Sequence, residues 1–316
     1  MTPLDQVTLK VAAVQAAPVF LDLDATVDKT VGLIAEAAAG GATVVAFPEG
    51  FVPGHPGWVE LLPLDDRAMQ LNERLFKNAV EVPGAAIDMI AQACGKHGIA
   101  AVVGVCERRP RTTGTLFNTQ VFIDASGTIA CKHQKFVPTI GERIVHGPGT
   151  TGTANDMRVG DVTVTGLICG ENSNPLAQYS TACAYPTLHV ASWPQHFSPD
   201  LAMQPVIELV GPALAYTLKA FVINSVTTIS DRMEEAYGTD TTRAFLSDAA
   251  SGGRASVVGP GGQTVAEADG DDEQLVFAEI DPDAVIAPKF VHDTAGHYNR
   301  PELFAHLFAE PPAARG

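Results

Sequence analysis

Three reactive side chains each stand where an expected β-strand ends. Glu49 ends the run TVVAFPE, Lys135 ends IACKHQK and Cys169 ends VTVTGLIC. TVVAFPE and VTVTGLIC have the length and residue types of buried β-strands, and IACKHQK is the second strand of an expected hairpin. Strand ends are where α/β proteins bind their ligands. If the fold brings the three side chains together, they supply a nucleophile, a base and a cation. That combination can make and break an acyl bond.

The cysteine is the candidate nucleophile, because a thiolate is a strong nucleophile. Cys169 precedes a helix that we expect to begin near Asn174, and a helix N-terminus lowers the pKa of a thiol. Glu49 can take the thiol proton, and Lys135 and the Gly170 N–H can stabilise charge on the attacked atom. Taken singly, these residues also have ordinary interpretations as a core cysteine, a turn glutamate and a solvated lysine.

Strand patterns alternate with helix patterns along the chain. The first helix is expected to have Asp24 as its N-cap, and Pro212 is expected to kink a later one. The periodicity predicts strands at 7–16, 43–49, 100–107, 162–169, 187–193, 221–226 and 274–280, hairpins at 118–135 and 255–268, and helices at 24–39, 85–97, 174–185 and 203–220.

So many strands, several of them in hairpins, favour mixed sheets with helices on the outer faces over a simple doubly wound parallel sheet. The polar stretch 229–254 is predicted to be a long surface loop near a site. Because no shift in composition marks a linker, we expect residues 1–308 to form a single domain and residues 309–316 to be a disordered tail.

The composition is that of a globular protein. Of the 316 residues, 46% are hydrophobic and 18% are charged, which is enough apolar surface for a sizeable core. The formal net charge of −16 argues against nucleic acid or an anionic membrane as a partner. We find no secretory signal and no apolar stretch of the roughly 20 residues that a membrane helix needs, so we expect a cytoplasmic protein.

The cysteines and histidines do not form a metal or disulfide pattern. The five cysteines are scattered without a CxxC pair, which fits neither a disulfide framework nor a zinc ribbon. The nine histidines include no HExxH motif. We therefore expect no metal, most cysteines buried and one of them reactive.

The segments around the three reactive residues resemble the nitrilase branch of the carbon–nitrogen hydrolase superfamily. The family's glutamate, lysine and cysteine motifs are similar, in family order, to FPEGFVPGHPGW (47–58), KHQKFVPTIGERIVHG (132–147) and GLICGENSNPLAQYS (166–180). The opening segment 11–29 is also similar, and HVASWP (189–194) and AGHYNRPELF (295–304) are more typical of nitrilases than of the amidase branches.

The resemblance implies an α/β fold in the form of a four-layer αββα sandwich, with two mixed β-sheets flanked by helices. It also implies that no cofactor is needed, that the substrate is a small nitrile or amide, and that protomers pair as a homodimer or larger homo-oligomer. Glu49, Lys135 and Cys169 match the family's catalytic residues. Glu142 matches a second glutamate that orients Lys135 or shares acid–base work, with a structural salt bridge as its alternative.

Four residues are candidates for binding the substrate: Gly170, Trp193, Trp58 and Asn172. The two tryptophans have a core or interface role as their alternative, and Asn172 has the alternative of positioning the turn after Cys169. The sequence also departs from many nitrilases, which have Trp where this chain has Gly170 and His146. Both departures bear on the substrate range.

The interpretation that follows is a nitrilase, which hydrolyses an organic nitrile to the carboxylic acid and ammonia through a thioimidate and a thioester on Cys169. The nearest alternative is an amidase or N-carbamoyl hydrolase with the same Glu-Lys-Cys triad. A variant that releases the amide is another. A non-catalytic binding protein on the same fold is disfavoured, because inactivated copies usually lose one of the three residues.

Overall fold

The computed structural model describes residues 8–248 and 252–308, so the predicted tail 309–316 lies outside the described residues. The strands are β1 (Leu9–Gln15), β2 (Val44–Ala46), β3 (Ala100–Arg108), β4 (Leu116–Ile123), β5 (Ile129–Gln134), β6 (Asp156–Val159), β7 (Val162–Ile168), β8 (Leu188–Trp193), β9 (Phe221–Val226), β10 (Ser256–Val258), β11 (Thr264–Glu267) and β12 (Gln274–Ile280). The helices are α1 (Leu23–Ala39), α2 (Asp66–Asn78), α3 (Ala85–His97), α4 (Pro175–Ala182), α5 (Met203–Leu218), α6 (Asp231–Tyr237), α7 (Arg243–Leu246) and α8 (Ile286–Val291).

The strands form one continuous 12-stranded mixed sheet. Its main path is β5-β4-β3-β2-β1-β9-β8-β7-β6, with β12 paired to β1, and β10 paired to β9 and β11. The predicted α/β class is confirmed. The expected two separate sheets are instead joined, because β1 and β9 run parallel and pair through Gln15 and Val226.

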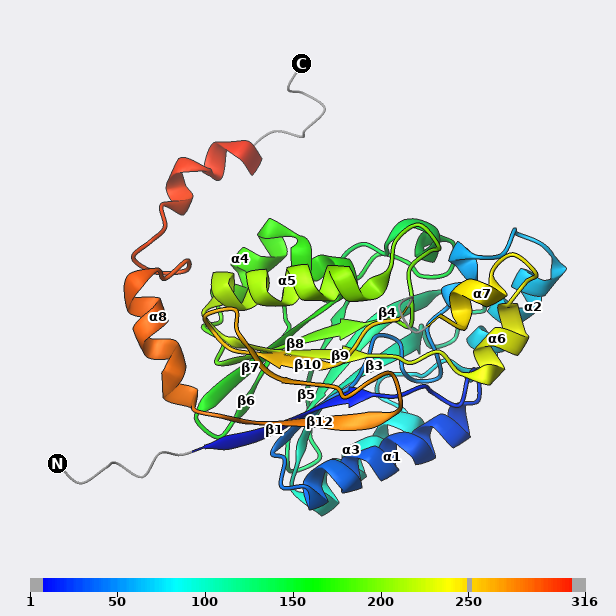
Figure 1. Ribbon diagram of the computed structural model, residues 1–316, viewed down its shortest axis with the longest axis horizontal. Helices are drawn as coiled ribbons and strands as arrows, with labels where there is room; N and C mark the ends of the chain where they lie inside the picture. Colours follow the sequence, from blue (N-terminus) through cyan, green and yellow to red (C-terminus); the bar gives the residue numbers. More distant parts are fainter. Residues whose placement is uncertain (1–7, 249–251, 309–316) are drawn as a thin grey trace.

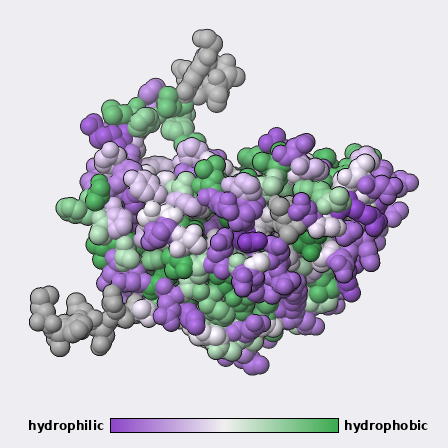
Figure 2. All heavy atoms as spheres, viewed as in Figure 1, coloured by the Kyte–Doolittle hydropathy of each residue, from purple (hydrophilic) through white to green (hydrophobic). Residues whose placement is uncertain are grey.

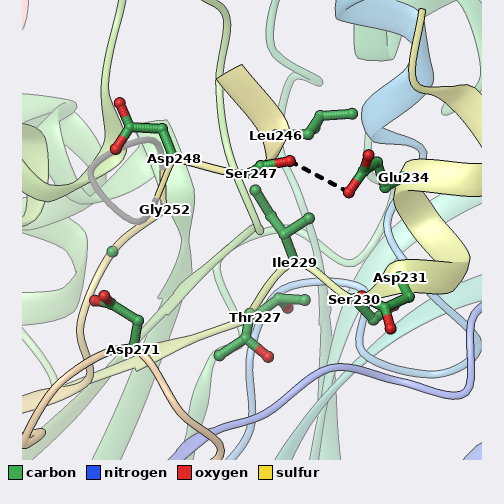
Figure 3. A pocket seen from close by; sticks show the side chains of 12 residues that line it. Thr227, Ile229, Ser230, Asp231, Glu234, Leu246, Ser247, Asp248, Gly252 and Asp271 are labelled. Carbon is green, nitrogen blue, oxygen red and sulfur yellow. Dashed lines mark hydrogen bonds between the residues drawn. The ribbon is translucent and has the colours of Figure 1, made fainter. Parts of the chain in front are cut away.

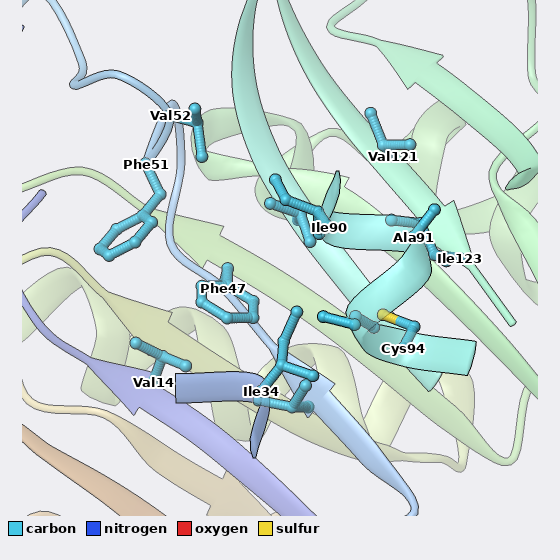
Figure 4. Close-up of a cluster of buried hydrophobic side chains, with 14 of the residues drawn as sticks. Val14, Ile34, Phe47, Phe51, Val52, Ile90, Ala91, Cys94, Val121 and Ile123 are labelled. Atoms are coloured by element: carbon cyan, nitrogen blue, oxygen red, sulfur yellow. The ribbon is translucent and has the colours of Figure 1, made fainter. Parts of the chain in front are cut away.

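The two halves of the sheet, β5 to β1 and β9 to β6, face each other across a shared apolar core. Side chains of a strand alternate between its two faces. Accordingly, Val11 and Ala13 of β1 contribute to the shared core, together with Val190 of β8, whereas Val14 lies in a second core. Figure 4 shows this second core, in which side chains of the sheet pack against α1 and α3.

The other half of the sheet is covered by α5. Ile207 and Leu214 of this helix share an apolar core with Ala191 of β8 and Val222 of β9. Figure 1 shows α4 and α5 on one side of the sheet and α1 and α3 on the opposite side. The layers therefore follow the order helix, sheet half, sheet half, helix.

Two local predictions differ from the structure. The first helix is capped by Asp22 and not by Asp24, because the Asp22 carboxylate accepts a hydrogen bond from the Ala25 N–H and the helix begins at Leu23. The stretch 229–254, expected to be a loop, contains α6 and α7 within its described part. Packing accounts for this difference, because Met233, Tyr237 and Leu246 are buried in an apolar cluster.

The segment 286–308 projects from the body of the molecule (Figure 1). Its exposed apolar side chains include Phe290, Val291, Tyr298 and Phe304. Hydrophobic atoms along this segment are visible in Figure 2. In the part of the chain that the structure describes, no helix is both long and apolar enough to cross a membrane.

Candidate active site

Glu49, Lys135 and Cys169 come together beyond the ends of β2, β5 and β7. Each is almost completely buried, and all three line one cavity. Lys135 and Cys169 directly follow their strands, and Glu49 lies just after β2. The three strand ends that the sequence singled out therefore meet at one place.

Hydrogen bonds across the two halves of the sheet fix the segment that carries Glu49. The Glu49 N–H donates to the Trp193 carbonyl at 3.2 Å. The hydroxyls of Ser192 and Ser225 donate to the carbonyls of Phe47 and Ala46, at 2.9 Å each. Because β8 and β9 belong to the other half, the base is held where the two halves meet.

The Lys135 ammonium bridges two carboxylates. Its Nζ donates to Glu49 Oε1 at 2.7 Å and to Glu142 Oε2 at 2.6 Å. Burial alone would lower the pKa of Lys135, but Glu49 and Glu142 outweigh it and hold this pKa well above its ordinary value. Lys135 is therefore a permanent cation in the site.

Glu142 is saturated with hydrogen-bond donors. Oε2 accepts from Lys135 and, at 2.9 Å, from the Thr139 N–H. Oε1 accepts from Asn118 Nδ2 at 2.7 Å and lies 2.9 Å from His146 Nδ1. Burial would raise the pKa of Glu142, but Lys135 and then His146 hold it well below its ordinary value. An ionised carboxylate cannot donate, so His146 carries its proton on Nδ1.

Glu49 differs from Glu142 because one of its oxygens is free. Oε1 accepts from Lys135 and, at 2.6 Å, from Asn118 Nδ2. Oε2 is buried and has no hydrogen-bond partner among the described residues. Burial raises the pKa of Glu49, Lys135 opposes that shift, and the negative charge of Glu142 adds to it. Glu49 is thus the carboxylate of the pair that can accept a proton.

Cys169 begins the 3₁₀ turn Cys169–Ser173 in a left-handed backbone conformation, with a φ of 49°. Residues other than glycine rarely adopt this conformation, and it turns the chain sharply out of β7. The Gly170 N–H hydrogen bonds to the thiol and lowers its pKa, as Lys135 does. Burial and then the Glu49 charge dominate, however, and raise the pKa of Cys169 well above its ordinary value.

The expectation that a helix N-terminus lowers the Cys169 pKa is therefore wrong. The helix α4 begins where expected, with Asn174 as its N-cap, but a full 3₁₀ turn separates the thiol from that cap. In the resting site the Cys169 sulfur keeps its proton. Cys169 must therefore lose this proton to a base at the same time as its sulfur attacks the substrate.

Glu171 and Asn172 hold the turn that carries the cysteine. The Glu171 carboxylate accepts from the Ile168 N–H at 2.9 Å and from the Phe136 N–H at 2.7 Å, which ties the Cys169 turn to the segment after Lys135. Asn172 Nδ2 donates to the Cys169 carbonyl at 3.0 Å. Both residues position the turn, which was the alternative interpretation for Asn172.

A cavity of about 200 Å³ opens over the three residues. Gly170 and Trp193 line it, whereas Trp58 and Asn172 do not. Trp58 is completely buried and donates its indole N–H to Asn72 Oδ1 at 3.2 Å. One wall is apolar and includes Phe197, Leu201, Val206 and Val210.

Comparison with known proteins identifies the family. The sequence model of the family described as carbon–nitrogen hydrolase matches residues 10–289. The chain belongs to the carbon–nitrogen hydrolase family. It is an enzyme of the nitrilase type, and the resemblance read from the sequence motifs is confirmed.

Two curated relatives of this hydrolase are nitrilases. It is 33% identical to a nitrilase of Bacillus sp. (strain OxB-1) over 95% of its own chain and 87% of that protein. It is 35% identical to an aliphatic nitrilase of Rhodococcus rhodochrous over 95% of its own chain and 82% of that protein.

Solved structures of an amidase from Nesterenkonia sp. AN1 share the fold. One is a mutant showing covalent addition of the acetamide moiety of fluoroacetamide at the active site cysteine. It has a TM-score of 0.68 and 17% identity to the hydrolase, and the match covers 96% of this chain and 98% of the amidase. At this identity the likeness shows the fold alone.

Sequence reasoning missed two polar residues of the hydrolase site. Asn118 lies inside β4 and donates to both Glu49 and Glu142. His55 lines the cavity, with Nδ1 3.9 Å from Glu49 Oε1. His55 lay within the quoted glutamate motif and could have been weighed, whereas only the pairing of β4 with β5 places Asn118 beside Lys135.

Glu49, His55 and Glu142 also have the composition of a metal site, since one ligand atom of each lies within 4.8 Å of the others. Both carboxylates, however, already accept hydrogen bonds from the Lys135 ammonium. Lys135 thus supplies the positive charge at the position where a cation would compensate them.

A second pocket, of about 410 Å³, lies beyond the end of β9 (Figure 3). Its lining includes Asp231, Glu234, Asp248 and Asp271, and it shares no lining residue with the cavity over Cys169. Asp271 pairs with Arg254, with 3.2 Å between Oδ1 and Nε, so part of its acidic charge is balanced. None of the predicted site residues lines this pocket.

Proposed function

We propose that this hydrolase is a nitrilase, which converts an organic nitrile to the carboxylic acid and ammonia with Cys169 as nucleophile. The observation that carries the proposal is the buried arrangement of Cys169, the free oxygen of Glu49 and the Lys135 cation in one cavity. Curated relatives named nitrilases, with 33–35% identity over 95% of the chain, support a nitrile as the substrate.

The first stage forms a thioimidate. Glu49 takes the thiol proton as Sγ attacks the nitrile carbon, one electron pair of the triple bond moves to nitrogen, and the proton passes to that nitrogen. Lys135 and the Gly170 N–H stabilise the negative charge that develops there. The apparent obstacle, the raised pKa of Cys169, is overcome because Glu49 accepts the proton as the C–S bond forms.

The second stage releases ammonia and then the acid. Water adds to the thioimidate carbon, its two protons pass to nitrogen by way of Glu49, and the C–N bond breaks to leave a thioester and ammonia. A second water attacks the thioester carbon, the C–S bond breaks with its electron pair going to sulfur, and Glu49 returns the proton to Sγ. The covalent intermediates thus divide one difficult hydrolysis into easier steps.

Glu142 has a different role in this mechanism. All four of its hydrogen-bond donors are in place, so it acts as the fixed anion that orients Lys135 and not as a proton carrier. Of the two roles that the sequence left open, we therefore favour orientation of Lys135. Trp193 and Gly170 line the cavity that the substrate would enter.

An amidase or N-carbamoyl hydrolase is the second candidate, since an amide reaches the same thioester without the thioimidate. Gly170 favours it to some extent, because many nitrilases have Trp at this position. A binding protein without activity is disfavoured, because Glu49, Lys135 and Cys169 are not only present but joined in one buried network.

We also propose that residues 1–308 form one carbon–nitrogen hydrolase domain and that the protein assembles as a homodimer or larger homo-oligomer. The family match over residues 10–289 supports the first statement. The exposed apolar side chains of residues 286–308 support the second, because such surfaces are usually covered by a partner. Analytical ultracentrifugation tests the assembly, and a monomer at micromolar concentration would contradict it.

The function is tested with a panel of aliphatic, aromatic and arylaliphatic nitriles, run beside the matching amides. Ammonia, acid and amide are measured for each compound with the wild-type protein and with Cys169→Ala. We expect nitriles to give acid and ammonia, and the variant to give neither. Turnover of amides alone would move the enzyme to the amidase branch, and activity in Cys169→Ala would contradict the nucleophile.

A further inference from the structure

His55 presents a buried nitrogen to the active-site cavity without a protein partner. The side chain is nine-tenths buried, and Nδ1 finds no hydrogen-bond partner in the described parts of the chain. The backbone of His55 is held from outside the cavity, because its carbonyl accepts a hydrogen bond from Gln195 Nε2 at 3.3 Å. Buried polar atoms nearly always have a partner, so this nitrogen requires an explanation.

The backbone around His55 brings its ring close to the base. Gly50 adopts a left-handed conformation, and a Cβ at this position would lie 3.2 Å from the Cα of His55. A side chain here would therefore crowd the loop that returns His55 toward Glu49. This close approach of residues 50 and 55 places His55 on the same side of the loop as Glu49, with 3.9 Å between His55 Nδ1 and Glu49 Oε1.

That distance suits one bridging water molecule. His55 Nδ1 lies 3.9 Å from Glu49 Oε1, which is too long for a direct hydrogen bond. A polar separation above about 3.5 Å is the range in which water bridges two groups. Glu49 Oε2, free of described partners, offers a further acceptor to the same molecule.

Other lining residues are less suited to this task. Both ring nitrogens of His196 are engaged, with Nδ1 2.8 Å from the Phe197 carbonyl and Nε2 3.1 Å from the Tyr237 hydroxyl. The Ser173 hydroxyl donates to the Gly170 carbonyl at 2.9 Å. Burial lowers the pKa of His55 to about 3, so its ring is neutral at physiological pH and has one nitrogen free to accept or donate.

We propose that His55 holds the hydrolytic water against Glu49, an inference that rests on the proposed function. In the second half of the reaction, this water forms the C–O bond to the thioester carbon and gives one proton to Glu49. The C–S bond breaks with its electron pair going to sulfur, and Sγ then takes the proton from Glu49. His55 neither gains nor loses a proton over the cycle.

Hydroxylamine tests the proposal, because it competes with water for the covalent intermediates and gives hydroxamate or amidoxime in place of acid. His55→Phe keeps a ring of similar size and removes both nitrogens. We expect the ratio of hydroxylamine adducts to acid to rise by about five- to tenfold in this variant, the scale of one lost hydrogen bond. The covalent enzyme should also accumulate in intact-protein mass spectra.

His55→Gln and Val206→Ala are the matched variants. Gln can still hydrogen bond to water, so its adduct ratio should lie closer to the wild-type value than to that of His55→Phe. Val206 belongs to the apolar wall of the same cavity, and its truncation should change KM without changing the ratio. Alkylation of Cys169 by iodoacetamide needs no water and should stay within about twofold of wild type in His55→Phe.

An unchanged ratio in His55→Phe, with an altered KM, would overturn the proposal and make His55 a substrate contact. Slow alkylation of Cys169 would overturn it in favour of a role in activating the thiol. A crystal structure of the wild-type enzyme gives an independent test that needs no variant to fold: without a water bonded to both His55 Nδ1 and Glu49, the proposal fails. If the wild-type enzyme forms neither acid nor adduct, the proposed function itself fails.

Discussion

Lys135 Nζ lies 2.6 Å from Glu142 Oε2, and this buried ion pair separates the roles of the two glutamates in the site. Glu142 accepts four hydrogen bonds and is held as an anion. Glu49 shares the same lysine but keeps one oxygen free, and burial raises its pKa. One carboxylate therefore fixes the cation, and the other is left to move protons.

Glu142→Gln tests the first of these roles. The substitution leaves the charge of Lys135 balanced by Glu49 alone, and breaking a buried ion pair costs about 3–5 kcal/mol. We expect the free energy of unfolding at neutral pH to fall by that amount and activity to fall with it. Urea denaturation followed by circular dichroism measures the change, and a loss below about 1 kcal/mol would contradict the role.

The ion pair of Glu142 should also make the free energy of unfolding depend on pH. The folded-state pKa of Glu142 lies well below its ordinary value of 4.5, so its stabilisation is present above that value and is lost as the pH falls. Unfolding free energies measured from neutral to acidic pH should decline less in Glu142→Gln than in the wild-type protein. Parallel profiles would show that Glu142 titrates normally.

Glu49→Gln should slow every step that moves a proton. Loss of a general base typically costs about 10²- to 10⁴-fold in rate. We expect Cys169 to be alkylated by iodoacetamide more slowly in this variant, with the exposed Cys183 as an internal reference whose rate does not change. Mass spectrometry of peptides measures both sites, and equal rates at Cys169 in the two proteins would contradict the assignment.

The raised pKa of Glu49 predicts where kcat/KM falls as the pH is lowered. The base works only when it is ionised, so kcat/KM should fall as the pH drops through the pKa of Glu49. Because burial raises that pKa, the midpoint of the fall should lie above 4.5, the ordinary value for a glutamate. Activity that persists unchanged down to that value would contradict Glu49 as the base.

Asn118 is predicted to keep the two carboxylates at their working separation. Its Nδ2 lies 2.6 Å from Glu49 Oε1 and 2.7 Å from Glu142 Oε1. Asn118→Leu removes these donors without a large change of volume and should shift the acidic limb of kcat/KM. The buried Asn155, which bonds to Gly166 and Thr181 outside the cavity, provides the control: Asn155→Leu should lower stability without shifting that limb.

Two glycines of the cavity wall should respond differently to an added methyl group. A Cβ at Gly170 meets only Thr139 Oγ1, at 3.4 Å, whereas at Gly57 it would lie 2.2 Å from Gln195 Nε2 and 2.9 Å from His196 Nε2. Gly170→Ala should therefore keep kcat/KM within about threefold of wild type, and Gly57→Ala should lower it more strongly by displacing Gln195. Equal losses of kcat/KM in the two variants, measured on a panel of nitriles, would contradict this difference in the space around the two glycines.

The strand ends that carry Glu49, Lys135 and Cys169 were predictable from the sequence, because apolar runs end near Glu49 and at Cys169, and a hairpin pattern ends at Lys135. The division of roles between Glu49 and Glu142 was not, since it depends on Asn118, Thr139 and other donors brought in by tertiary pairing. The pKa of Cys169 was predicted in the wrong direction for a related reason. The nearby helix start was visible in the sequence, but burial beside Glu49 was not.

The fold shows the same limit of local information. Alternating apolar residues predicted the strands, and the α/β class followed from their order. The junction of β1 with β9 rests on the pairing of Gln15 with Val226 and on hydrogen bonds of Ala16 just beyond it, which leave no pattern in either strand. Likewise, α6 lies in a polar stretch, and only the burial of Met233 and Tyr237 against distant residues explains why it is a helix.

Mass spectrometry of the acid-quenched enzyme shows most directly whether Cys169 forms a covalent intermediate with a nitrile. The protein is mixed with a nitrile that it turns over, quenched within the first turnovers and digested. We predict the mass of the acyl or imidoyl group on the peptide containing Cys169, and on no peptide of Cys169→Ala. Turnover to the acid without any adduct on Cys169, or with an adduct on another residue, would contradict Cys169 as the nucleophile.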